Sequence, residues 1–289
     1  MNKNFAIQNT NMILGTANLG MHYGINNRKS TSKIESIEII RLAIDCGVLG
    51  IDTAKAYGSA ETIIGKATSK NSHIRVTTKL HLNADSNFDS IKVQIEDSLA
   101  KTKQKKLYGL LIHNTEAIRR NDIRGIVDAI YETELVTKVG VSCYDVKDIL
   151  VAKETCDSFE LFQVPENILD QRLIDSSEMS VLAKQGNEFH VRSIFLQGLL
   201  LINPKAEALP LEFDRSALLN LHNYATQHNV SVIDICMSYA RSIPWSKGTV
   251  IAAASREQMA EILNHREIKF QPRIFQTLPE SIIDPRYWR

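Results

Sequence analysis

Cysteine is scarce in this chain, and what there is does not form a recognisable pattern. The 289 residues contain four cysteines, Cys46, Cys143, Cys156 and Cys236. No two of them make a C-x-x-C pair, and none has a histidine nearby at the spacing of a metal site. This excludes a disulfide framework and predicts a reducing compartment and no bound metal.

Excess charge and long apolar runs are also missing. The formal net charge is +1, whereas a nucleic-acid or membrane partner would need a concentrated basic face. No run of about 18 apolar residues occurs, so no membrane-spanning helix is expected. The N-terminal MNKNFAIQNT is too polar for a secretory signal peptide. We therefore expect a cytoplasmic protein that binds neither nucleic acid nor membrane.

The chain does contain a regular alternation of short apolar runs and amphipathic segments. Eight strand-like runs lie at residues 12–17, 48–53, 74–79, 107–113, 137–142, 159–164, 189–195 and 248–254. Helix-like segments lie at residues 32–47, 60–68, 86–102, 124–133, 145–153, 177–186, 215–229, 231–242 and 256–265. Such alternation implies a parallel sheet.

Eight strands with few extra elements favour a closed (β/α)8 barrel, formed by one domain over residues 1–289. The alternative is an open, doubly wound sheet of the Rossmann type. No G-x-G-x-x-G follows the first apolar run, which disfavours that alternative.

Polar residues gather where the predicted strands end, which is the catalytic end of such a barrel. Asp52 ends the second run and is followed by Tyr57 in GIDTAKAYGSAE, Lys79 ends the third run, and His113 ends the fourth. Taken singly, each has an ordinary structural explanation, such as a solvated lysine or a tyrosine that covers the edge of the core. Because they arrive on three consecutive strands, we predict that they form one catalytic site.

The chemistry of this set follows from its charges. A lysine ammonium beside a phenol favours the phenolate and lowers the tyrosine pKa from about 10 towards the working pH. Asp52 would be the counter-ion of a buried Lys79, which makes Tyr57 a general acid or base. His113 would donate a hydrogen bond to a substrate carbonyl. No side chain supplies a hydride, so a nicotinamide cofactor is implied.

These residues resemble the aldo-keto reductase family. MILGTANLG, GIDTAKAYGSAE, TTKL, LLIHN, GVS, FQVPENILD and QGLL follow one another in the family's order over almost the whole chain. The resemblance implies a (β/α)8 barrel that binds NADPH in an extended form without a Rossmann domain. It also implies that Asp52, Tyr57, Lys79 and His113 are the catalytic tetrad, with Tyr57 as the proton donor.

The resemblance implies cofactor-binding positions as well. The first-strand turn that approaches the cofactor matches Gly15, Thr16 and Ala17. The groups that hydrogen-bond the nicotinamide carboxamide match Ser142 and Gln163. The backbone that wraps the pyrophosphate matches residues 193–198, which include Ser193, Leu196 and Gly198. The adenosine end matches Ser255, Arg256, Gln258 and Glu261.

Several positions depart from the family pattern. Cys143 replaces a common asparagine, and Arg192 stands on the seventh strand where an aromatic residue commonly stacks on the nicotinamide. A guanidinium plane can also stack. AAASREQMAEIL has Ala253 in place of a glycine, a spacing one residue shorter, and Ile262 in place of an asparagine. Arg256 would still bind a 2′-phosphate, so NADP(H) is preferred and NAD(H) stays an alternative.

The predicted function is the reduction of an aldehyde or ketone to an alcohol with NADPH. The candidate substrate-binding residues are His22, Tyr23 and Asn114, with Met21 and Gln197 beside them. Their polarity, and a likeness of FQVPENILDQR and DPRYW to bacterial members linked to surface-polysaccharide metabolism, favour a sugar or sugar nucleotide.

Three other functions stay open. The first is an NAD(P)-dependent aldose or sugar dehydrogenase, and the second is a non-catalytic regulatory subunit that binds the cofactor. The third is an unrelated barrel isomerase or lyase, which would need no nicotinamide. In each of the redox cases we expect a small-molecule carbonyl or sugar as the partner and a monomer or weak oligomer.

Overall fold

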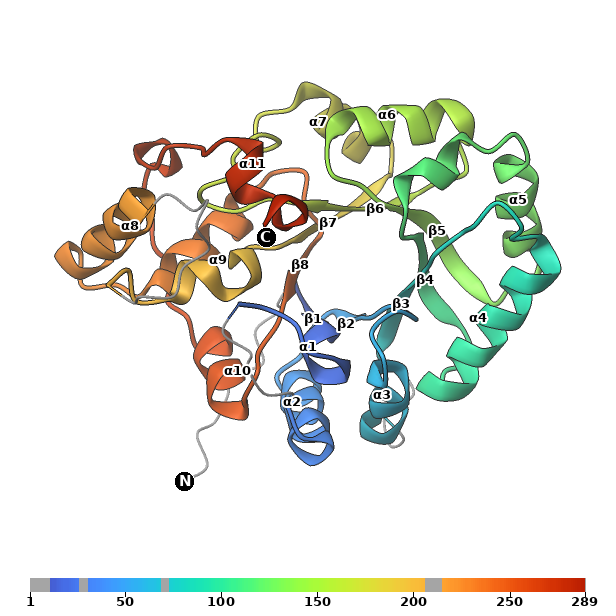
Figure 1. Cartoon of the computed structure of the whole chain (residues 1–289), viewed down its shortest axis with the longest axis horizontal. Coiled ribbons are helices and arrows are strands. Elements are labelled where there is room, and N and C mark those ends of the chain that lie inside the picture. Colours follow the sequence, from blue (N-terminus) through green and yellow to red (C-terminus); the bar gives the residue numbers. More distant parts are fainter. Residues whose placement is uncertain (1–10, 26–30, 69–72, 206–214, 289) are drawn as a thin grey trace.

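Eight parallel strands close into a barrel in the order β1 to β8, with β8 paired to β1 (Figure 1). The structure is a computed structural model that describes residues 11–25, 31–68, 73–205 and 215–288, so MNKNFAIQNT lies outside it. The strands are β1 (Met12–Gly15), β2 (Gly50–Asp52), β3 (Arg75–Leu80), β4 (Leu107–Ile112), β5 (Val136–Ser142), β6 (Leu161–Pro165), β7 (Glu188–Arg192) and β8 (Gly248–Ile251). The predicted (β/α)8 barrel is confirmed. The predicted runs at 12–17, 189–195 and 248–254 extend past the strands, because the chain turns at the barrel mouth while its residues are still small or apolar.

Helices ring the barrel on all sides (Figure 1). Those between or after the strands are α2 (Lys33–Asp45), α3 (Ala60–Thr68), α4 (Phe88–Thr102), α5 (Ile123–Glu132), α6 (Val146–Thr155), α7 (Ser177–Lys184), α8 (Arg215–Gln227), α9 (Val232–Ser242) and α10 (Arg256–Leu263). The short helical turns are α1 (Ala17–Gly20), η1 (Thr115–Arg119), η2 (Leu196–Leu201), η3 (Pro272–Ile274), α11 (Glu280–Ile283) and η4 (Pro285–Tyr287). All nine helices expected from the sequence are present.

Capping residues decide where the helices begin and end. Ser32 accepts a hydrogen bond from the Glu35 N–H and caps the start of α2. Gly47 follows the end of α2 with a φ of 79°, a conformation that glycine adopts without a steric cost. At α4 the cap is Asn87, whose side chain accepts from the Ser90 N–H and whose own backbone N–H donates to the Ser90 hydroxyl in a capping box.

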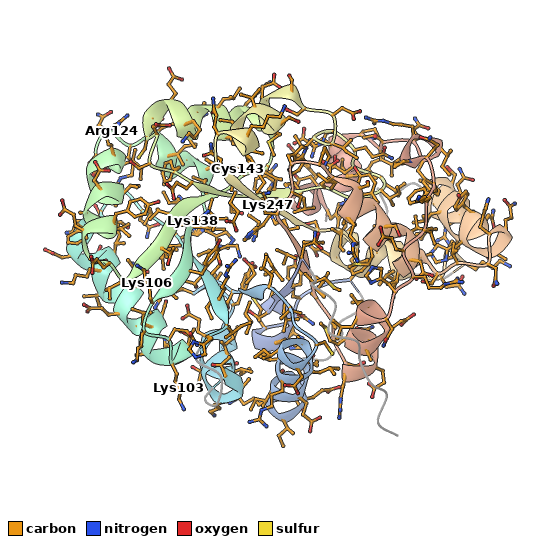
Figure 2. All side chains as sticks on the ribbon, turned by 180° about the vertical axis from the view of Figure 1, so that it is seen from behind. Lys103, Lys106, Arg124, Lys138, Cys143 and Lys247 are labelled. Carbon is orange, nitrogen blue, oxygen red and sulfur yellow. The ribbon has the colours of Figure 1, made fainter. Side chains whose placement is uncertain are left out.

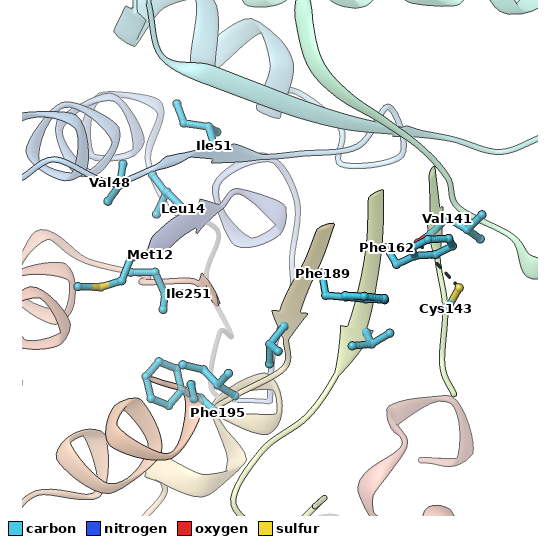
Figure 3. Close-up of a cluster of buried hydrophobic side chains, with 14 of the residues drawn as sticks. Met12, Leu14, Val48, Ile51, Val141, Cys143, Phe162, Phe189, Phe195 and Ile251 are labelled. Carbon is cyan, nitrogen blue, oxygen red and sulfur yellow. Dashed lines mark hydrogen bonds between the residues drawn. The ribbon is translucent and has the colours of Figure 1, made fainter. Parts of the chain in front are cut away.

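Residues that face outward from the strands pack beneath the helices. Met12, Leu14 and Ile51 belong to this buried apolar layer, which Figure 3 shows around β1, β2, β6 and β7. The rings of Phe162 and Phe189 stack with their centroids 5.6 Å apart. This layer fixes the strands to the helix shell and leaves the alternate residues of each strand for the barrel axis.

The register of the strands sets which residues share the inner face. Near the carboxyl ends of the strands, the paired residues on this face are Gly15 with Asp52, Lys79 with Leu111, Ser142 with Gln163, and Pro165 with Arg192. Thr78, which lies between two inward residues, instead donates a hydrogen bond outward to Glu61 on α3 over 2.8 Å. Side chains from β2, β3, β5, β6 and β7 are therefore directed at one place, the barrel mouth.

The opposite end of the barrel is closed by a polar cluster. Glu188 receives hydrogen bonds from the Tyr108 hydroxyl at 2.6 Å and from Lys138 Nζ at 2.7 Å, and it lies 2.8 Å from His190 Nε2. Figure 2 shows this end, with Lys138 and Lys247 near the amino ends of β5 and β8. The Lys138–Glu188 ion pair and the contacts of Tyr108 and His190 with Glu188 tie β4, β5 and β7 together here, far from the mouth.

The residues after Phe270 form the short elements η3, α11 and η4. The indole of Trp288 donates a hydrogen bond to the Ile282 carbonyl over 2.7 Å, which holds the last described turn. All four cysteines are buried and unbridged. Within residues 11–25, 31–68, 73–205 and 215–288, no helix is long and apolar enough to span a bilayer, and no cluster of side chains is suited to a metal ion.

Candidate active site

Lys79 and Asp52 form a buried ion pair at the mouth of the barrel. Lys79 Nζ lies 2.6 Å from each carboxylate oxygen of Asp52 and 3.1 Å from the Thr53 carbonyl. Only 2% of Lys79 and 4% of Asp52 is exposed. Burial lowers the pKa of Lys79, and the charge and hydrogen bond of Asp52 oppose that shift. The pair is the one predicted from the ends of the second and third runs.

Gln163, on β6, is hydrogen-bonded to this ion pair. Its Nε2 donates a hydrogen bond to Asp52 Oδ1 over 2.8 Å, from β6 across the barrel. The residue matched to the nicotinamide carboxamide is therefore bonded to the carboxylate matched to the tetrad. Nothing in the linear sequence signals this contact, because 111 positions separate the two residues.

Tyr57 lies in the loop between β2 and α3 and lines the central cavity. Gly58 turns the chain behind it with a φ of 57°, and a Cβ there would lie 2.5 Å from the Gly20 carbonyl oxygen. This explains the glycine that follows the tyrosine in GIDTAKAYGSAE. Lys79 Nζ lies 5.5 Å from the centroid of the Tyr57 ring.

The pKa of Tyr57 differs from the sequence expectation. Burial, followed by the charge of Asp52, raises the pKa of Tyr57, and the charge of Arg192 opposes the shift. We expected Lys79 to lower this pKa towards the working pH. Burial and the negative charge of Asp52, whose two oxygens also contact Lys79 at 2.6 Å, outweigh the effect that we expected of Lys79. Tyr57 therefore keeps its proton at ordinary pH.

His113 follows β4 directly, and its backbone N–H donates a hydrogen bond to the Leu80 carbonyl over 2.8 Å. Its ring meets the Tyr57 ring edge to face, with centroids 6.2 Å apart, and lies 5.4 Å from the His81 ring. Burial, then the charges of Lys79 and His81, lower the pKa of His113 to about 4. The imidazole is therefore neutral and carries one N–H that can donate a hydrogen bond.

A cavity of about 230 Å³ opens at the barrel mouth. The predicted residues that line it are Gly15, Thr16, Ala17, Tyr23, Asp52, Tyr57, Gln163, Arg192, Ser193, Gly198 and Gln258, with Gln197 beside them. The predicted residues outside this lining are His22, Lys79, His113, Asn114, Ser142, Leu196, Ser255, Arg256 and Glu261. Lys79 and His113 reach it through their contacts with Asp52 and Tyr57.

Two of the residues outside the lining have structural partners. The Asn114 side chain exchanges two 3.0 Å hydrogen bonds with the backbone of Leu82, so its amide ties the loops after β3 and β4 together. The Ser255 hydroxyl accepts the Gln258 N–H and caps α10. Arg256 and Glu261 are exposed on that helix.

Asn18, which no sequence motif singled out, also lines the cavity. Its Nδ2 donates to the Ala253 carbonyl over 2.6 Å, while its buried Oδ1 has no partner among the described residues. The residue stands inside MILGTANLG, but only the short α1 turn directs its side chain into the cavity.

The residues present fit a nicotinamide dinucleotide. The cavity is lined by Tyr57 and also by Ala254 and by Gln258 of α10. The chain has positive φ at Ser193, Leu196, Gln197 and Gly198, and all of these except Leu196 line the cavity. The unpaired Oδ1 of Asn18 is a ready acceptor for a hydroxyl or amine of a bound molecule.

Comparison with known proteins agrees with this geometry. The family described as the aldo/keto reductase family matches residues 11–283. D-Arabinose 1-dehydrogenase of Saccharomyces cerevisiae is 24% identical over 274 residues, which cover 84% of this chain and 81% of that protein. An aldo-keto reductase from Bacillus halodurans in its holo form shares the fold, with a TM-score of 0.74 and 17% identity over 90% of this chain and 88% of that one.

A second solved structure, glycerol dehydrogenase from Gluconobacter oxydans, has a TM-score of 0.68 and 19% identity over 90% of this chain and 88% of that one. At such identities the solved structures support the barrel fold, while the family match extends along the chain from β1 to α11. With the ion pair, the phenol and the imidazole gathered at the mouth of the barrel, this chain belongs to the aldo-keto reductase family of NAD(P)H-dependent oxidoreductases.

Proposed function

We propose that this protein reduces an aldehyde or ketone to an alcohol, with Tyr57 as the proton donor to the carbonyl oxygen. The observation that carries the proposal is the Tyr57 phenol in the cavity wall, next to the Lys79–Asp52 pair and the His113 ring. Burial raises the pKa of Tyr57, which keeps the phenol protonated, the form that a proton donor needs. His113, neutral and edge-on to Tyr57, would donate its N–H to the same oxygen and orient it.

A bound nicotinamide cofactor supplies the hydride that no side chain can supply. In this proposal Gln163 in the cavity wall holds the carboxamide together with Ser142, its register partner on β5. The turn after β1 approaches the nicotinamide end of the cofactor. The backbone of residues 193–198 wraps the pyrophosphate, and Asn18 accepts from a cofactor hydroxyl or amine. The first turn of α10, with Gln258 in the cavity wall, receives the adenosine end.

NADPH is the cofactor that we propose over NADH. Arg256 is exposed in the first turn of α10, beside the capping Ser255. A guanidinium there pairs well with a 2′-phosphate, because the charge-assisted hydrogen bonds of arginine to phosphate are among the strong ones. Equal affinity for NADH and NADPH would contradict this preference.

A sugar or sugar nucleotide is the substrate class that we propose, because the wall of the cavity contains hydroxyl, amide and guanidinium groups. A second candidate is the oxidation of an aldose, favoured by the similarity to a D-arabinose 1-dehydrogenase. Oxidation needs Tyr57 as a phenolate that accepts the alcohol proton, so its raised pKa favours reduction near neutral pH.

The test begins with NADPH binding, followed by cofactor fluorescence, and continues with turnover of small aldehydes and sugars. Tyr57→Phe should bind NADPH as tightly as the parent protein and lose about 10²- to 10⁴-fold in turnover, the usual size of a general-acid contribution. Tyr287→Phe is the control, since Tyr287 is 53% exposed on η4 and outside the cavity wall.

Three results would change the proposal. Failure to bind NADPH or NADH would remove the oxidoreductase mechanism for this chain. Binding without turnover of any aldehyde or sugar would favour the regulatory alternative. An active Tyr57→Phe variant would remove the role of Tyr57, and faster oxidation of D-arabinose with NADP⁺ than reduction of any carbonyl would favour the dehydrogenase.

A further inference from the structure

Arg192 is a cation without a counter-ion in the wall of the cavity. It ends β7 and lines the cavity together with Tyr57 and Tyr23. Its guanidinium makes two long hydrogen bonds, both 3.3 Å, to neutral acceptors, the Ser193 hydroxyl and the Cys143 carbonyl. Its Nε is buried and has no partner among the described residues. Leaving such a group unpaired costs free energy, which a ligand of opposite charge would recover.

The neighbouring cations are paired, which sets Arg192 apart. Lys79 contacts both oxygens of Asp52 at 2.6 Å. Arg286, from the chain end, donates to Asp284 through Nε over 2.8 Å and lies 3.8 Å from Glu280. No carboxylate in the described part of the chain comes within ion-pair distance of Arg192. The mouth of the barrel therefore keeps one positive charge that the protein itself does not neutralise.

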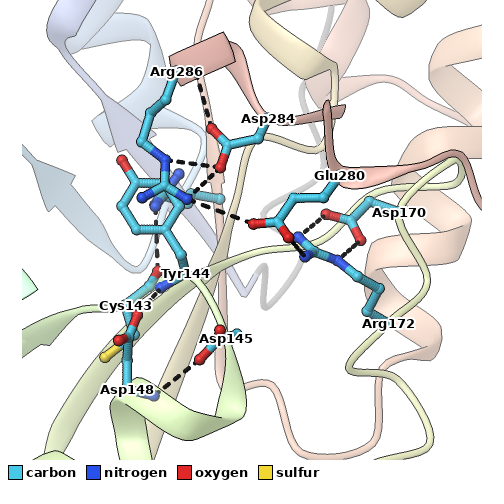
Figure 4. A network of polar contacts seen from close by, with 10 residues as sticks. Cys143, Tyr144, Asp145, Asp148, Asp170, Arg172, Glu280, Asp284 and Arg286 are labelled. Atoms are coloured by element: carbon cyan, nitrogen blue, oxygen red, sulfur yellow. Dashed lines mark hydrogen bonds and ion pairs between the residues drawn. The ribbon is translucent and has the colours of Figure 1, made fainter. Parts of the chain in front are cut away.

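The Arg192 guanidinium lies over an aromatic ring and not against an acid. Figure 4 shows that ring, Tyr144, with Arg286 against it. The guanidinium carbon of Arg192 lies 4.7 Å from the centroid of the Tyr144 ring, and that of Arg286 lies 3.4 Å from the same centroid. Because Asp284 and Glu280 fix Arg286, the C-terminal segment holds the Tyr144 ring in place. A stacked guanidinium keeps its N–H groups in the ring-parallel plane and available to an acceptor.

Arg192 also acts on the groups that would carry out the chemistry. Its charge opposes the rise in the pKa of Tyr57 that burial and Asp52 cause, and it adds to the fall in the pKa of His113 that burial causes. Arg192 and Tyr57 also line the same cavity of about 230 Å³. An anion bound by Arg192 would therefore sit within the length of a small molecule from the oxygen that Tyr57 protonates.

We propose that Arg192 binds an anionic group, a carboxylate or a phosphate, on the carbonyl substrate, so that the enzyme prefers acidic carbonyl compounds to neutral ones of the same shape. This inference rests on the proposed carbonyl reduction and narrows its substrate class. The anion is not consumed, and its role is to hold the carbonyl carbon and oxygen beside Tyr57.

Two matched pairs of aldehydes test the preference and separate carboxylate from phosphate. The first pair is 4-carboxybenzaldehyde and 4-formylbenzamide, and the second is glyceraldehyde 3-phosphate and glyceraldehyde. In the parent protein, kcat/KM should be about 10- to 100-fold higher for the anionic member of at least one pair, the effect of one charge-assisted hydrogen-bonded contact. The pair that shows the larger ratio identifies the anion.

Substitutions of Arg192 test whether its guanidinium causes the ratio of kcat/KM values. Arg192→Gln should bring the ratio to about 1. Arg192→Lys should keep part of the ratio, because the positive charge remains while the bidentate hydrogen-bonding geometry of the guanidinium is lost. Arg241→Gln is the matched control, since it removes one positive charge from α9, where Arg241 is 29% exposed and lies 3.8 Å from Glu267. The ratio in this control should equal that of the parent protein.

The affinity for NADPH, measured by fluorescence in each variant, separates the alternatives. Equal rates for both members of each pair in the parent protein would overturn the inference while leaving carbonyl reduction intact. A ratio that survives in Arg192→Gln would overturn it as well. A weaker NADPH affinity in Arg192→Gln, with no change in the ratio, would show that Arg192 serves the cofactor. Absence of any aldehyde reduction would instead contradict the proposed function.

Discussion

The Lys79–Asp52 ion pair permits a prediction whose size follows from its burial. Lys79→Met removes an ammonium that contacts both oxygens of Asp52 at 2.6 Å. Asp52 then stays in a site that is 4% exposed, with the Gln163 amide as its remaining side-chain donor. Removing one partner of a buried pair costs about 3–5 kcal/mol, because the other charge is left unpaired. At about 2–4 °C per kcal/mol, the melting temperature should fall by roughly 6–20 °C.

The free energy of unfolding is measured by urea titration and the melting temperature by heating, both followed by tryptophan fluorescence, to which the buried Trp245 contributes. Lys101→Met is the matched control, because the Lys101–Asp97 contact is similarly short at 2.7 Å but its side chains are 44% and 42% exposed. An exposed pair contributes at most about 1 kcal/mol. The double variant Lys79→Met/Asp52→Asn removes the unpaired charge and should recover most of the lost stability. The reasoning is refuted if Lys79→Met costs no more than Lys101→Met, or if the double variant is no more stable than Lys79→Met alone.

Two further predictions concern pH. Burial raises the pKa of Tyr57 and lowers that of His113 to about 4, so kcat/KM for reduction should be nearly level from about pH 5 to about pH 9, and a titration near pH 6.5 would contradict this. Burial raises the pKa of Glu166 to about 8, opposed by the hydrogen bond from Tyr239. The folded protein then holds a proton that the unfolded chain releases near pH 4.3, so this group lowers the free energy of unfolding as pH rises to about 8, by up to about 1.4 kcal/mol per unit. Glu166→Gln should remove that slope in urea unfolding measured at several pH values, and parallel curves for the two proteins would disprove the assignment.

Much of the fold was predictable from local patterns. The apolar runs, the helix spacing and the caps at Ser32 and Gly47 act within a few residues, so the sequence alone indicates eight strands and the helices between them. The same holds for Asp52, Lys79 and His113, which lie at or next to the ends of their strands. In a parallel barrel the carboxyl ends of all strands meet at one mouth, so residues at these ends lie close together although they are far apart in the sequence.

Side-chain direction was harder to predict where loops set it. Asn114 follows β4 as closely as His113 does, yet its amide bonds the backbone of Leu82 and does not line the cavity. No sequence pattern predicted a role for Asn18 in the site, yet the α1 turn places it in the cavity wall. Both outcomes depend on how one loop packs against another, which no short sequence pattern records.

The sequence by itself determined the barrel and the set of groups that meet at its mouth, because periodicity and strand ends are local properties. The hydrogen bonds between those groups and the shifts in their pKa values depend on the tertiary structure. It joined Gln163 to Asp52 across the barrel and raised the pKa of Tyr57 by burying the phenol near the Asp52 carboxylate. It also gives Arg192 no carboxylate partner among the described residues. Charge interactions and desolvation depend on distances through space, so they arise only when residues far apart in the chain are packed together.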